Sequence, residues 1–86
     1  MLSFPNTSRS YNGSADRVSF WGHDGALEVP FFLGAATLFR LFPKTGYGEA
    51  AILAAFDSGR ARIHEVASKA YARGHHRSYV LGPDSL

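Results

Sequence analysis

The chain has 86 residues, a length that supports one folded domain and leaves no chain for a second hydrophobic core. It is 45% hydrophobic and contains no cysteine, which argues against a disordered segment, a disulfide scaffold and a zinc site built on thiolates. The net charge is only +2, and its positive excess falls in the last third of the chain. We therefore expect one small globular domain, residues 1–86.

Two features of the first half of the chain bear on its location. Residues 1–10 lack the basic leader and apolar run of a secretory signal. The longest apolar run, Val29 to Phe39, is about half as long as a membrane-spanning helix must be. We expect a cytoplasmic protein that does not cross a membrane.

Two runs with alternating hydrophobicity flank Asp24-Gly25 and predict a β-hairpin. The runs are Val18 to His23 and Ala26 to Phe31, and Asp-Gly is a common two-residue hairpin turn. If Asp24-Gly25 forms the turn, His23 pairs with Ala26, and counting outward places Phe20 opposite Val29. The strand before the turn then buries Val18 and Phe20, and the strand after it buries Val29 and Phe31.

Pro30 conflicts with this register, because it falls at a hydrogen-bonded pair where it has no N–H to donate. Either the ladder frays at Pro30 or the strand lies at an edge of the sheet. Two further short strands are expected. One lies around Arg9 to Tyr11, before Asn12-Gly13, and the other is Ser78 to Leu81.

Two helices are predicted in the second half of the chain. A short one spans Gly34 to Phe42 and ends at Pro43. A long one spans Glu49 to Arg73, with apolar residues at helical spacing on one face: Ile52, Leu53, Phe56, Ile63, Val66, Ala67, Ala70 and Tyr71. Gly59 lies on that apolar stripe, so either the helix approaches the sheet closely there or the chain bends and Asp57-Ser58 caps a second helix. We expect one continuous helix.

These elements predict an α+β domain. A small antiparallel sheet of three to four strands, including the Asp24-Gly25 hairpin, packs against one long and one short helix.

Several runs in the sequence match a known family. They are Ser19-Phe20-Trp21-Gly22-His23-Asp24-Gly25, Phe31-Phe32, Ala55-Phe56-Asp57, Arg60, Ile63, Ala67, Tyr71, Ser78-Tyr79 and Leu81. On these residues the chain resembles the small proteobacterial proteins grouped as domain of unknown function fourteen-eighty-eight. Gly59 departs from the pattern, since relatives tend to have a polar residue there. The resemblance implies a compact α+β domain and no established activity.

The hairpin also carries the first candidate site. Trp21, His23 and Glu28 share the strand face opposite the predicted core, and an aromatic residue beside polar groups suits contact with a partner. The alternative is that Trp21 lies under another strand or in a dimer interface. His23 next to Asp24 resembles an oriented acid–base or metal-binding pair, but Asp-Gly is also what the turn requires. We therefore expect a structural role for that pair.

Catalytic and metal-binding patterns are otherwise sparse. His75 and His76 are adjacent, so in a strand they would point to opposite faces, and at most one would join His23 and Asp24 at a metal. No phosphate-binding loop or close pair of carboxylates is present. We expect no metal, no cofactor and no enzymatic activity.

The second candidate site is the basic side of the long helix. Arg62, Lys69 and Arg73 are candidates for binding phosphates, although Glu65 lies four residues before Lys69, as in ordinary solvated helices. Arg60 follows Asp57 by three residues, and we expect these two to form an ion pair.

The sequence thus favours a non-enzymatic cytoplasmic interaction module that acts through protein–protein contacts as a homodimer. The alternative is weak binding of a nucleic-acid phosphate backbone by Arg62, Lys69 and Arg73.

Overall fold

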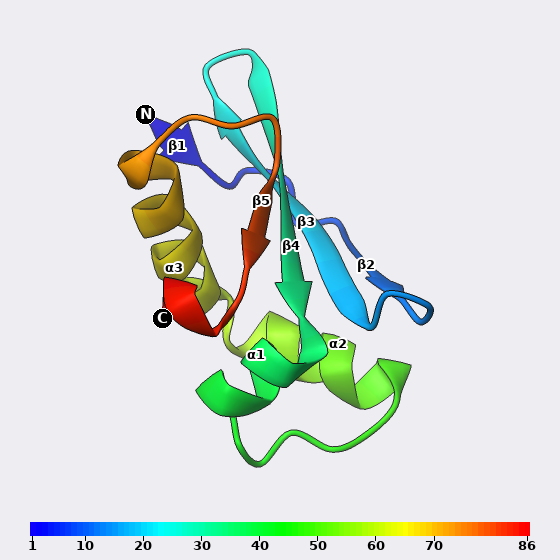
Figure 1. Cartoon of the computed structure of the whole chain (residues 1–86). Helices are drawn as coiled ribbons and strands as arrows, with labels where there is room; N and C mark the ends of the chain where they lie inside the picture. The colour runs from blue at the N-terminus through cyan, green and yellow to red at the C-terminus, as the bar shows by residue number, and fades with distance from the viewer.

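A computed structural model describes the whole chain, residues 1–86, as one β-sheet with three α-helices and a final 3-10 turn (Figure 1). The elements in chain order are β1 (Leu2–Ser3), β2 (Arg9–Asn12), β3 (Arg17–Asp24), β4 (Leu27–Gly34), α1 (Ala35–Leu41), α2 (Glu49–Ser58), α3 (Arg60–Arg73), β5 (Tyr79–Leu81) and η1 (Pro83–Ser85). The sheet has five strands, of which β1 and β2 both pair with β3, followed by β4 and β5. The α+β class is as predicted, with more strands than expected.

The prediction of a purely antiparallel sheet is wrong, because β5 pairs with β4 in parallel. Parallel neighbours need a crossover connection, and the three helices between β4 and β5 supply it. In Figure 1, α3 runs back along the sheet toward the tip of the β3–β4 hairpin, and the chain then re-enters the sheet as β5 in the direction of β4. The direction of β5 therefore depends on where α3 ends.

The β3–β4 hairpin forms, but its register differs from the prediction by two residues. Asp24 pairs with Leu27 and Phe20 pairs with Phe31, so the turn consists of Gly25 and Ala26. Gly25 has φ +62°, the left-handed conformation that a type II′ turn requires of its first central residue. Because a shift of two residues preserves the alternation of side chains, the predicted buried face is nevertheless correct.

The same shift removes the conflict at Pro30. Counted from the closing pair of the hairpin, Pro30 and Trp21 occupy a non-hydrogen-bonded pair, so the missing N–H points away from β3. On its other side β4 pairs with β5 only from Phe31 onward. The proline therefore lies within a central strand without breaking either ladder.

The prediction of one continuous helix over residues 49–73 is also wrong. The helix begins at Glu49 and ends at Arg73 as expected, but Gly59 divides it into α2 and α3. Figure 1 shows α2 crossing the end of the sheet beside α1 and α3 turning to run along the sheet. The bend arises where the ring of Phe42 lies against the backbone of Gly59.

The hydrophobic core lies between the inner face of the sheet and the helices. The buried core cluster comprises Val18, Phe20, Val29, Phe31, Leu33, Ala35, Leu38, Ile52, Phe56, Ile63, Val66, Ala67, Tyr71, Tyr79 and Leu81. Its centre is aromatic, with the rings of Phe20 and Phe31 5.3 Å apart and those of Phe20 and Phe56 5.1 Å apart. None of the helices combines the length and hydropathy needed to cross a bilayer.

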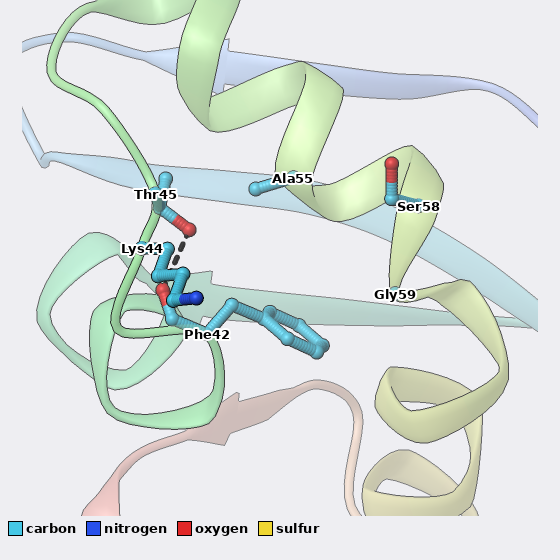
Figure 2. Close-up of a pocket in the computed structure, with 6 residues that line it drawn as sticks. All are labelled: Phe42, Lys44, Thr45, Ala55, Ser58 and Gly59. Atoms are coloured by element: carbon cyan, nitrogen blue, oxygen red, sulfur yellow. Dashed lines mark hydrogen bonds between the residues drawn. The ribbon is translucent and has the colours of Figure 1, made fainter.

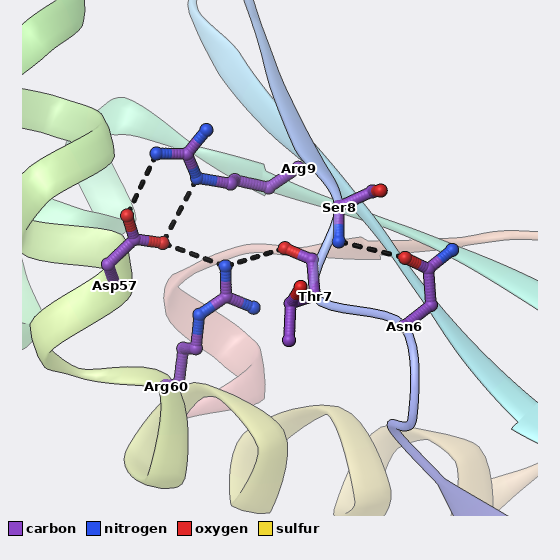
Figure 3. Close-up of polar contacts among 6 residues, drawn as sticks. All are labelled: Asn6, Thr7, Ser8, Arg9, Asp57 and Arg60. Carbon is purple, nitrogen blue, oxygen red and sulfur yellow. Dashed lines mark hydrogen bonds and ion pairs between the residues drawn. The ribbon is translucent and has the colours of Figure 1, made fainter.

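A polar cluster fastens Thr7 and the first residue of β2, Arg9, to the bend between α2 and α3 (Figure 3). Asp57 accepts two hydrogen bonds from Arg9, of 3.0 and 2.8 Å, and one of 2.8 Å from Arg60. Arg60 also donates to the carbonyl oxygen of Thr7 at 2.7 Å. The predicted Asp57–Arg60 ion pair is confirmed, and Arg9 is an additional partner.

Candidate functional site

The sheet has one face that contributes nothing to the core. We define the outer face as the side chains that point away from the helices on β3, β4 and β5. These are Arg17, Ser19, Trp21, His23, Glu28, Pro30, Phe32 and Val80. None of them is buried, and none belongs to the hydrophobic core or to the apolar residues packed against it. The outer face is thus a surface of three strands against which no helix of the fold packs.

Apolar residues form a continuous band across the middle of the outer face. Trp21 pairs with Pro30 across β3 and β4, and Phe32 pairs with Val80 across β4 and β5. Val80 is 68% exposed, a large fraction for an apolar residue in a strand. Sequence alternation dictates this band, because each of these residues alternates with a core residue of the same strand.

The charged residues of the outer face lie at its two ends. His23 and Glu28 are paired near the hairpin tip, and Arg17 lies at the opposite end of β3. The guanidinium carbon of Arg17 is 4.0 Å from the centre of the Phe32 ring, a cation–π contact that holds the charge over β4. The backbone of Arg17 thus lies at one end of the outer face and Glu28 at the other, while the Arg17 charge reaches inward to the edge of the apolar band at Phe32.

Trp21, His23 and Glu28 do share the face that the sequence assigned to them. Sequence reasoning missed Arg17, Phe32 and Val80, which complete the same surface. Arg17 and Phe32 could have been found by continuing the inward–outward alternation of side chains by two residues along each strand, from Ser19 to Arg17 and from Pro30 to Phe32. No local signal identifies Val80, because its position depends on the parallel pairing of β5 with β4.

His23 and Asp24 do not form a catalytic pair, because successive strand residues point to opposite faces. Asp24 instead accepts hydrogen bonds of 2.6 Å from the Tyr71 hydroxyl and 2.8 Å from the α-amino group of Met1. These bonds lower the pKa of the Asp24 carboxyl, and the bond to Asp24 raises the pKa of Tyr71 to about 12. The carboxylate thus ties the hairpin tip to the end of α3.

The other histidines near this end pack on tyrosines. The ring of His75 stacks on Tyr71 with centroids 4.6 Å apart, and the ring of His76 meets Tyr79 edge-on at 5.5 Å. No three histidine or carboxylate side chains of the chain are grouped as ligands of one metal ion. The arrangement is that of aromatic packing around the start of β5.

The three basic residues proposed for phosphate binding lie exposed on α3. Arg62 donates to Glu65 at 2.7 Å, and Lys69 lies 3.5 Å from the same carboxylate. Arg73 is in the last turn of the helix, where a cation suits the helix dipole. Glu65 thus draws two of the three cations into ordinary helix-surface ion pairs.

A hollow of about 360 Å³ lies between the end of α1 and the bend at Gly59. Figure 2 shows its lining, Phe42, Lys44, Thr45, Ala55, Ser58 and Gly59. The Thr45 hydroxyl is directed back into the loop, where it donates to the carbonyl oxygen of Phe42 at 2.8 Å. The other polar side chains of the lining are Lys44 and Ser58.

Comparison with known proteins agrees with the sequence motifs. The model of the family described as Protein of unknown function (DUF1488) matches residues 2–81, which include all five strands and all three α-helices. No curated protein and no solved structure gives a significant match. The match covers nearly the whole domain, and the chain therefore belongs to the DUF1488 family of proteins of unknown function.

Proposed function

We propose that this protein is a non-enzymatic cytoplasmic interaction module and that its outer face binds another polypeptide. The observation that carries the proposal is the apolar band of Trp21, Pro30, Phe32 and Val80 on a sheet face that no helix of the fold packs against. An antiparallel strand pair such as β3–β4 with one free face usually exposes polar side chains there. An aromatic and aliphatic band in that position is characteristic of a contact surface.

The composition of the outer face supports contact with protein. Interface centres are rich in aromatic residues and poor in charge, and their rims are polar. Trp21 and Phe32 lie in the middle, whereas Arg17 and Glu28 lie at the ends. A nucleic-acid phosphate backbone binds to clustered cations, and the outer face is largely neutral. The outer face is therefore better suited to a polypeptide than to a phosphate backbone.

The proposal is tested by photo-cross-linking in cells. A photoreactive phenylalanine analogue replaces Phe32 on the outer face, and in a matched control it replaces Ala72, which is exposed on α3. We expect a cross-linked protein product from position 32 and none from position 72. The additional change Ser19→Lys, which places a charge in the middle of the outer face, should abolish the product.

Two results would contradict the proposal. One is an absence of cross-linked polypeptide at position 32 when the chain is produced at its natural level. The other is a product that persists unchanged with Ser19→Lys, since the contact would then not use the middle of the outer face.

A further inference from the structure

The outer face carries one strongly basic and one acidic residue, and they are placed symmetrically. Along the β3–β4 pairing, the Phe20–Phe31 pair is the midpoint between the pair that contains Arg17 and the pair that contains Glu28. Trp21 and Ser19 belong to the pairs immediately on either side of this midpoint. A two-fold rotation about this midpoint therefore places the end of the face that carries Arg17 where the end that carries Glu28 was.

We infer that the partner of the outer face is the outer face of a second copy of this chain. The two copies are related by a two-fold axis that lies between the sheets and crosses the strands level with the Phe20–Phe31 pair. This assignment rests on the proposed function and names its partner. A two-fold interface requires a self-complementary surface, and opposite charges at equal distances from the axis meet that requirement.

The axis brings Arg17 of each copy to the end of the other copy that carries Glu28. The guanidinium of Arg17 lies over the Phe32 ring of β4, so the rotation brings it opposite Pro30 of the second copy, two residues along β4 from Glu28. The exposed Glu28 side chain has to lean toward it along the strand, over a spacing of about 7 Å. The Nε atom of Arg17 is buried without a hydrogen-bond partner, so an incoming carboxylate meets the terminal nitrogens. Two such ion pairs form, one at each end of the interface.

The same rotation matches large residues with small ones in the middle. It places Trp21 over Ser19 of the second copy and Phe32 over Pro30 of the second copy, because these residues lie one pair on either side of the axis. Two sheets packed face to face need such interdigitation to approach to about 10 Å. The indole ring would then fill the space above a serine.

The outer face is small for a stable dimer interface, so the relief of its side chains must contribute to the area that is buried. An eight-residue strand such as β3 is about 27 Å long, and the sheet is three to four strands wide at about 4.8 Å per strand. The flat area is therefore at most about 400–500 Å² before the relief of the side chains is counted, because β1, β2 and β5 are shorter than β3. A stable complex buries roughly 800 Å² on each partner, which is of the same order.

Charge reversal on the purified chain tests the assignment by sedimentation equilibrium. We expect the wild-type chain to be a dimer, and we expect Arg17→Glu and Glu28→Arg each to weaken it about tenfold or more, because each puts like charges at both ends of the interface. The double variant with both changes should dimerise again. A mixture of the two single variants should form a mixed dimer. Arg73→Glu, at the end of α3 and away from the outer face, is the control and should leave the dimer dissociation constant unchanged.

The sole tryptophan provides a second readout. Quenching of Trp21 fluorescence by acrylamide should fall as the chain dimerises, and Ser19→Lys should prevent that fall. A monomer at all concentrations overturns the second copy as partner, as does a dimer in which the double variant is not restored. If position 32 still cross-links to a different polypeptide in cells, the proposed function stands without this inference.

Discussion

The ring of Phe42, directly after α1, occupies the space that a side chain on Gly59 would fill. The backbone of Gly59 has φ −103° and ψ 16°, a conformation open to any residue, so the requirement for glycine is one of space. The amide of Gly59 is shared between the carbonyl oxygens of Ala55 at 3.0 Å and Phe56 at 3.2 Å, which marks the bend. The close packing of Phe42, after α1, against Gly59, after α2, therefore sets the direction in which α3 leaves the bend.

We predict that Gly59→Ala destabilises the domain by about 1–2 kcal/mol. The added methyl group forces the Phe42 ring out of its position, and overpacking of this kind outweighs the gain in helix propensity from alanine. Urea unfolding followed by circular dichroism measures the change.

Phe42→Ala is the matched background for that substitution. With the ring removed, Gly59→Ala should become neutral or stabilising by up to about 1 kcal/mol, since only the propensity difference remains. Equal effects in both backgrounds would show that the ring does not constrain Gly59.

We predict that Asp57→Asn lowers the free energy of unfolding by about 0.5–1 kcal/mol at neutral pH, the range for solvent-screened ion pairs. The bonds from Arg9 and Arg60 lower the pKa of the Asp57 carboxyl below its usual 3.8. Because the pKa of Asp57 is lower in the folded than in the unfolded state, its carboxylate stabilises the domain at any pH above the unfolded-state pKa. This stabilisation is lost as the pH falls through the folded-state pKa. Thermal unfolding from pH 6 to pH 2 should therefore show a shallower decline for Asp57→Asn than for the wild type.

We predict that the Tyr71–Asp24 hydrogen bond stabilises the domain until strongly alkaline pH. The pKa of Tyr71 is raised to about 12, so its contribution is fully present below the unfolded value of about 10 and is lost as the pH rises through 12. Tyr71→Phe should lower the melting temperature at pH 8, and this difference from the wild type should shrink above pH 10. In an ultraviolet titration, Asp24→Asn should return the Tyr71 pKa toward 10, and an unchanged value would exclude the bond as its cause.

We predict that His64 makes the domain less stable in mild acid. Its ring stacks on Phe4 with centroids 3.9 Å apart, and burial together with the nearby Arg60 charge lowers its pKa below the usual 6.5. A histidine with a lowered folded pKa stabilises the domain above the unfolded value, and that contribution is lost as the pH falls through the folded pKa. His64→Phe keeps the stack and should flatten the decline in melting temperature just below pH 6.5. If the melting temperature of His64→Phe declines with pH as steeply as that of the wild type, the loss of stability in mild acid is due to another titrating group.

The sequence determined which side chains are buried in the hairpin and which are not. Alternation in β3 and β4 is a local property with a period of two, and it survives a two-residue error in register. Trp21, His23 and Glu28 were therefore placed on the correct face even though Phe20 pairs with Phe31 and not with Val29. The ends of the region 49–73 were also readable, because a helix boundary depends on its own glycines and charges.

Only the tertiary structure decided the features that join distant segments. The helix bends at Gly59 because Phe42 is there, and Asp57 binds Arg9 as well as Arg60 because β2 lies beside α2. β5 runs parallel to β4, and thus adds Val80 to the outer face, because α3 ends near the hairpin tip. Local patterns specify the period and the face of each element, whereas these contacts depend on the relative placement of whole elements, which no short window of sequence contains.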